Sequence, residues 1–213
     1  MTKFGLPCMC SRVEVEELQV EMQRLLEKQH FLTTWDPETF FPPHTDVILE
    51  SSDAKQVYAH RATLMGKSEA FKVLFSPMLD KLIPITVKMD MEYKPLEAFI
   101  HFFYTGYIKD EYMDAFSDKL LRAADKYGIS LLHDQCQIKL MNSIHPDHIF
   151  HYYILGYKSH AKDLVQAIIE FVASNFGDIS EINGYDEFLK THPAHCARLC
   201  NGVVKKLKLK LTN

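Results

Sequence analysis

The chain has 213 residues, 47% of them hydrophobic and 24% charged, so it is long enough to bury a sizeable core. Its formal net charge of −4, with no clustering of basic and aromatic residues in the folded part, argues against nucleic acid as the main ligand. Five irregularly spaced cysteines are typical of a reducing compartment, so we expect the cytosol, the nucleus or both. No apolar run of about 18 residues is present, so we expect no transmembrane helix and no membrane partner.

The N-terminal segment, residues 1–40, contains an amphipathic pattern that predicts a helix from Val13 to Leu32. Its apolar positions recur at coiled-coil spacing and are Val15, Leu18, Met22 and Leu25. Two interpretations stay open, because such a stripe can pack on its own domain or pair with the same helix of a second copy. Pro42-Pro43 then belongs to a linker between this helix and the first strand.

Three short strands are predicted in the next part of the chain. Val47–Leu49 is an apolar run, Ser51–Asp53 has the composition of a turn, and Val57–Ala59 starts a second run, so the pattern predicts a β-hairpin. Ile83–Met89 alternates apolar and polar residues, which is typical of a strand with one buried face. Pro84 near its start favours the edge of a sheet.

A helix is predicted between the hairpin and the third strand. Ser68 suits the N-cap position, Glu69 complements the positive end of the helix dipole, and Pro77 stops the helix. Its apolar face is predicted to hold Phe71, Leu74 and Phe75.

Apolar stripes predict further helices up to the end of the chain. One begins near Pro95, carries Leu96, Phe99, Ile100 and Phe103 on its buried face, and ends at Gly106. Later helices are expected at about 118–127, 131–141, 164–172, 185–190 and 193–200. For the basic residues 204–213, a frayed and solvated tail is the simplest interpretation.

The order of these motifs resembles the BTB/POZ family. The matching motifs are Asp46 with its strand, Ala59-His60-Arg61 followed by Leu64, Ser68-x-x-Phe71-x-x-x-Phe75, Phe103-Tyr104-Thr105-Gly106, and the run from Leu120 to Tyr127. The resemblance implies an α+β fold over residues 41–142, with a small sheet flanked by helices. Residues 143–203 resemble the truncated, BACK-like helical extension that follows the BTB domain in MATH-BTB proteins.

The resemblance implies a non-catalytic adaptor that links a cullin-3 ubiquitin ligase scaffold to an unknown target protein. The alternative is a BTB oligomerisation or scaffold protein that does not engage a cullin. Cullin-binding relatives often carry a hydrophobic-x-Glu triplet after the second helix, and the aligned triplet here is Leu79-Asp80-Lys81, with lysine in place of glutamate. The expected cullin-contacting residues are Phe75, Leu79, Asp80, Lys81 and Tyr104. The expected homodimer contact combines the apolar stripe of residues 15–25 with Asp46 and Arg61, which match a charged pair near the dimer axis of the family.

We expect no catalytic residue, cofactor or metal. His60 has no nucleophile in an elbow near it, and no glycine-rich phosphate loop is present. His192, His195, Cys196 and Cys200 lie close in sequence. However, His192 precedes a proline and no Cys-x-x-Cys pair supports a zinc site, so half-buried cysteines are the simpler interpretation.

Overall fold

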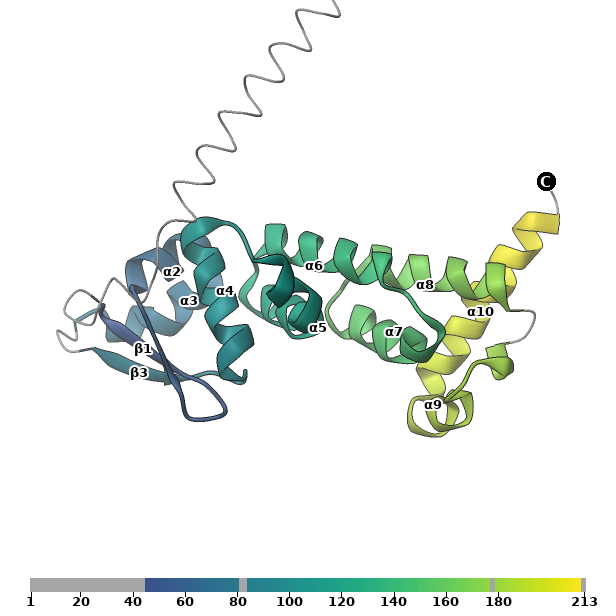
Figure 1. Ribbon diagram of the computed structural model, residues 1–213, viewed down its shortest axis with the longest axis horizontal. Helices are drawn as coiled ribbons and strands as arrows, with labels where there is room; N and C mark the ends of the chain where they lie inside the picture. The colour runs from purple at the N-terminus through teal and green to yellow at the C-terminus, as the bar shows by residue number, and fades with distance from the viewer. Residues whose placement is uncertain (1–44, 81–83, 177–178, 212–213) are drawn as a thin grey trace, which may run out of the picture.

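The computed structural model describes residues 45–80, 84–176 and 179–211. In chain order the elements are β1 (Val47–Glu50), β2 (Gln56–Ala59), α2 (Arg61–Lys67), α3 (Glu69–Phe75), the 3-10 turn η1 (Ser76–Met78), β3 (Ile85–Lys88), α4 (Tyr93–Thr105), α5 (Asp110–Tyr127), α6 (Ser130–Asn142), η2 (Pro146–His148), α7 (Ile149–Lys158), α8 (Lys162–Asn175), η3 (Ile179–Glu181), α9 (Tyr185–Thr191) and α10 (Pro193–Leu211). Figure 1 shows the sheet with α2 to α4 at one end, α5 and α6 in the middle, and the last helices towards the other end.

The three described strands form one sheet in the order β2-β1-β3. Strand β1 pairs antiparallel with β2, with Val47 opposite Ala59, which confirms the hairpin. It pairs parallel with β3, with Val47 opposite Ile85 on the other side. Strand β3 therefore lies at an edge of the described sheet and buries Ile85 while exposing Thr86, as the alternation and Pro84 predicted.

Ser68 links the start of α3 to the end of α5. Its Oγ accepts a hydrogen bond from the Phe71 backbone N–H at 3.2 Å, which confirms the predicted N-cap. The same hydroxyl donates to the Tyr127 carbonyl at 2.6 Å, where α5 ends. One small side chain thus satisfies a terminal amide of one helix and a terminal carbonyl of another.

A group of aromatic side chains packs around Phe71 in the core of the domain. Phe71 stacks on Phe75 and on Tyr127, with ring centroids 5.5 Å and 4.5 Å apart, and meets Phe103 edge-on at 5.5 Å. The predicted stripe of α4 is buried and consists of Leu96, Phe99, Ile100 and Phe103. Gly106 ends this helix at φ 71°, a left-handed conformation that glycine adopts without steric cost.

Helix α5 begins earlier than the sequence indicated. It starts at Asp110, two turns before the expected position near residue 118. Asp110 and Glu111 occupy its first turn, where acidic side chains favour the helix dipole. Tyr112, Met113 and Phe116 of these turns are half-buried against the core, and only Ser117 among residues 110–117 is fully buried. Their apolar pattern is therefore a weaker signal than the fully buried stripe that follows.

Helix α10 is also longer than expected, because it continues past Cys200 to Leu211 instead of giving way to a frayed tail. Leu199 and Val203 are buried, and Leu207 is half-buried against the core, so the apolar face of the helix continues into the basic segment. A Cβ placed on Gly202 would lie 2.8 Å from Ile169 Cδ1, so the backbone of α10 packs closely on α8. This packing explains why the residues beyond Cys200 stay helical.

Cys136 belongs to the core of α6. Burial raises the pKa of its thiol to about 12, so the group stays protonated and behaves as a small apolar side chain. Among the helices that the structure describes, none is long and apolar enough to cross a membrane.

Candidate functional site

Arg61, the first residue of α2, joins three segments of the domain. Its Nε donates to Asp46 Oδ2 at 2.9 Å, and its backbone N–H donates to Asp46 Oδ1 at 2.7 Å. Its Nη1 donates to the Met78 carbonyl at 2.5 Å. The Arg61 side chain is 11% exposed and that of Asp46 is 42% exposed, so the pair is partly screened by water on the carboxylate side.

Asp46 therefore has two roles in the fold. It precedes β1, and its carboxylate accepts the first backbone amide of α2, one of the amides that a helix cannot satisfy internally. Asp46 and Arg61, which were matched through the family resemblance, thus form an ion pair within one chain. Whether this pair lies at a dimer contact stays a prediction.

Tyr104, near the end of α4, holds the residue before Arg61. The His60 backbone N–H donates to Tyr104 Oη at 2.8 Å, and the His60 Nδ1 lies 2.9 Å from the same oxygen. Burial raises the pKa of the Tyr104 phenol, although the hydrogen bonds from His60 and Thr63 oppose the shift. The phenol stays protonated at neutral pH and ties α4 to the start of α2.

Leu79 follows these anchored residues and is 55% exposed. It comes directly after η1, and the exposed Asp80 is its neighbour in the loop. The carbonyl of the preceding residue, Met78, is the one held by Arg61. Leu79 is thus an exposed apolar side chain next to a fixed point of the backbone.

The structure corrects one of the expected surface residues. Phe75 is 0% exposed and stacks on Phe71 in the core, so it cannot contact a partner directly. Its position on the apolar face of α3 already predicted burial, because Phe71 lies one turn earlier on the same face. Lys81 and the apolar stripe Val15, Leu18, Met22 and Leu25 lie outside the described residues.

Sequence reasoning missed the contact between Arg61 and Met78. A backbone carbonyl carries no residue-type signal, so only the folded loop reveals it as the third acceptor of the arginine. His60 was interpreted as a structural histidine, and its contact with Tyr104 gives that role a partner. The site so formed has an ion pair, a phenol and an exposed leucine, an arrangement suited to binding.

The histidines and cysteines near the C-terminal helix form no metal-binding group in the part of the chain that the structure describes. Within residues 45–80, 84–176 and 179–211, no group of three or more His, Cys, Asp or Glu side chains could hold a metal ion. His195 instead packs edge-on against Tyr157, with ring centroids 5.2 Å apart, and Cys196 is buried.

Comparisons with known proteins agree with this fold. The family model described as BTB/POZ domain matches residues 40–144. The chain is 26% identical over 171 residues to a BTB/POZ domain-containing protein of Arabidopsis thaliana, covering 78% of this chain and 60% of the relative. It is 27% identical over 171 residues to BTB and MATH domain-containing protein 42 of Caenorhabditis elegans, covering 79% of this chain and 40% of the relative.

The chain therefore spans less than two thirds of the length of both relatives. Among solved structures, the BTB domain of zebrafish PATZ1 is similar, with 22% identity, a TM-score of 0.42 and coverage of 57% of this chain and 94% of that one. The matched segment contains β1 to β3, α2 to α6, the Asp46–Arg61 pair and Leu79. Residues 40–144 of this chain are a BTB/POZ domain, a protein–protein interaction module.

Proposed function

We propose that the chain is an adaptor that links a cullin-3 ubiquitin ligase scaffold to a target protein. The observation that carries the proposal is the exposed Leu79 on a loop whose preceding carbonyl is held by Arg61. The similarity to a nematode protein named for its BTB and MATH domains supports it. In this proposal residues 143–203 serve as a BACK-like extension of the interaction module.

The geometry suits Leu79 to the role of an anchor. An apolar side chain that fills a partner's pocket contributes most when its backbone is fixed beforehand, because less ordering entropy is lost on binding. The chain Asp46–Arg61–Met78 supplies that fixation. Tyr104 then contributes indirectly, by holding the residue that precedes Arg61, instead of as a surface aromatic.

We expect Leu79→Asp to weaken binding of the cullin-3 N-terminal domain by at least about 2 kcal/mol, roughly 30-fold, because it places a charge in an apolar contact. Lys81→Glu should strengthen binding, since it restores the acidic residue of the triplet. Isothermal titration calorimetry with the full chain measures both changes.

Leu131→Asp is the matched control, because Leu131 on α6 is 57% exposed against 55% for Leu79. It should bind the cullin domain as tightly as the wild type. If the wild type does not bind and Lys81→Glu restores nothing, the adaptor function fails, and an oligomerisation module is the better account. If Leu131→Asp weakens binding as much as Leu79→Asp, the contact surface is elsewhere.

We also infer that the chain forms a homodimer, since BTB domains in general self-associate and the apolar stripe of residues 15–25 needs a cover. Light scattering of the wild type at tens of micromolar should give twice the mass of one chain. A dissociation constant in that range corresponds to a dimerisation free energy of about −6 to −7 kcal/mol. Leu18→Asp should shift the mass towards the monomer, whereas Glu17→Gln on the polar face should not. A wild-type monomer at that concentration would mean that the stripe packs on its own domain.

A further inference from the structure

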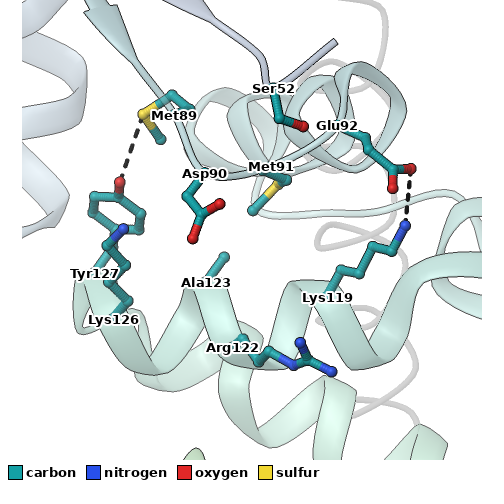
Figure 2. A pocket seen from close by; sticks show the side chains of 10 residues that line it. All are labelled: Ser52, Met89, Asp90, Met91, Glu92, Lys119, Arg122, Ala123, Lys126 and Tyr127. Carbon is teal, nitrogen blue, oxygen red and sulfur yellow. Dashed lines mark hydrogen bonds and ion pairs between the residues drawn. The ribbon is translucent and has the colours of Figure 1, made fainter.

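A pocket of about 300 Å³ lies between the loop that follows β3 and the second half of α5. Figure 2 shows the loop residues Met89 to Glu92 on one side and Lys119, Arg122 and Lys126 of α5 on the other. This loop follows β3, whereas Leu79 precedes β3, so the pocket is separate from the surface assigned to the cullin.

The basic side chains of the pocket form one row along α5. Lys119, Arg122 and Lys126 are spaced by three and four residues, so they share a helix face. At about 1.5 Å of rise per residue, the row is about 10 Å long. An extended peptide covers that length with about three residues.

Among the described residues, the first cation of this row has the shortest ion pair and the second has a longer one. Lys119 Nζ lies 2.9 Å from Glu92 Oε2. Arg122 is 3.9 Å from Asp118 Oδ2, beyond hydrogen-bond range, and Lys126 Nζ lies 5.4 Å from the Tyr127 ring centroid. Arg122 and Lys126 are both exposed and one turn apart, so they repel each other, and a bound anion would relieve that repulsion.

The rest of the pocket is apolar with one further carboxylate. Ala123 and Tyr127 are buried in its α5 wall, and Met91 is half-buried in the opposite loop. A methionine side chain adapts its shape to different apolar partners. The Asp90 carboxylate points into the pocket in Figure 2, where it can accept a backbone N–H of a bound peptide.

We propose that this pocket binds a short acidic segment of a partner protein in extended conformation. The carboxylates of the segment pair with Arg122 and Lys126, and an apolar side chain between them packs on Met91. The acids Asp90 and Glu92 offset two of the three cations of the lining and leave one positive charge in excess, which attracts an anionic segment. The proposal goes beyond the adaptor function, because it gives the domain a second, independent binding surface.

Fluorescence anisotropy of the full chain with a labelled peptide of sequence Glu-Leu-Asp-Glu tests this. We expect saturable binding that falls at least tenfold for the neutral analogue Gln-Leu-Asn-Gln. Arg122→Gln and Lys126→Gln should each weaken binding at least fivefold, whereas Asp90→Asn should tighten it, because removing the acid lowers the repulsion of the peptide. Lys162→Gln, at an exposed lysine of α8, is the matched control and should change nothing.

The proposal is overturned if the neutral analogue binds equally well, or if Arg122→Gln and Lys162→Gln behave alike. It is also overturned if inorganic phosphate competes at the concentration of the peptide. Replacing Glu14, Glu16 and Glu17 by glutamine must leave peptide affinity unchanged, since a gain would make the chain's own N-terminal segment the occupant. Arg122→Gln must retain the cullin affinity of the wild type, so failure of either proposal leaves the other standing.

Discussion

Phe71→Ala is expected to lower the free energy of unfolding by about 3–5 kcal/mol, because it removes a fully buried ring and leaves a cavity. The ring stacks on Phe75 and Tyr127 and meets Phe103 edge-on, so the loss reaches α3, α4 and α5 together. Aromatic contacts of this kind add to the loss of buried area. Urea unfolding followed by circular dichroism, at one fixed chain concentration, measures the change.

Val73→Ala is the control within the same helix. Val73 is 69% exposed in α3, so its truncation should change the free energy of unfolding by no more than about 0.5 kcal/mol. Equal losses for the two variants would show that the aromatic stack does not stabilise the domain.

Arg61→Ala is expected to cost about 2–3 kcal/mol of stability. It removes a charged hydrogen bond to Asp46 and leaves the Met78 carbonyl without its arginine partner. The cost stays below the roughly 3–5 kcal/mol typical of fully buried pairs, because Asp46 is 42% exposed and can be hydrated when the arginine is gone. Chemical unfolding of Arg61→Ala, Asp46→Ala and the double variant gives the coupling between the two side chains.

Arg122→Ala provides the matched control, because Arg122 is exposed and lies 3.9 Å from the Asp118 carboxylate with which it pairs. It should unfold almost as the wild type does. Arg61→Lys should recover only part of the loss, because one ammonium group cannot reproduce the fork that reaches a carboxylate and a carbonyl. An unchanged unfolding curve for Arg61→Ala would contradict the role given to this residue.

Much of the fold could be predicted because its signals are local. Ser68 predicts a helix start, because its hydroxyl can accept a hydrogen bond from a backbone amide of the first turn. The residues from Leu96 to Phe103 predict a buried helix, because their apolar side chains recur at helical spacing. The first turns of α5 could not be predicted in the same way, because residues 110–117 are held in a helix without a continuous buried stripe.

The candidate site shows the same division. Asp46, Arg61 and Leu79 were singled out because they match motifs of the family that the sequence resembles, and the structure pairs the first two and exposes the third. Phe75 was assigned to the surface by the family resemblance against its own position in the apolar stripe, and the stripe was the better guide. The basic row of α5 was visible as helical spacing in the sequence, but the loop facing it could be placed only by the folded chain.

The parallel pairing of β3 with β1 bears on the order in which the sheet assembles. Val47 meets Ala59 inside a short hairpin, but its other partner, Ile85, is reached only across helices α2 and α3. Because the entropy of loop closure grows with the logarithm of loop length, bringing β3 to β1 costs about 1 kcal/mol more than closing the hairpin. The hairpin is thus the less costly first step, and it supplies the template on which the more distant strand is placed.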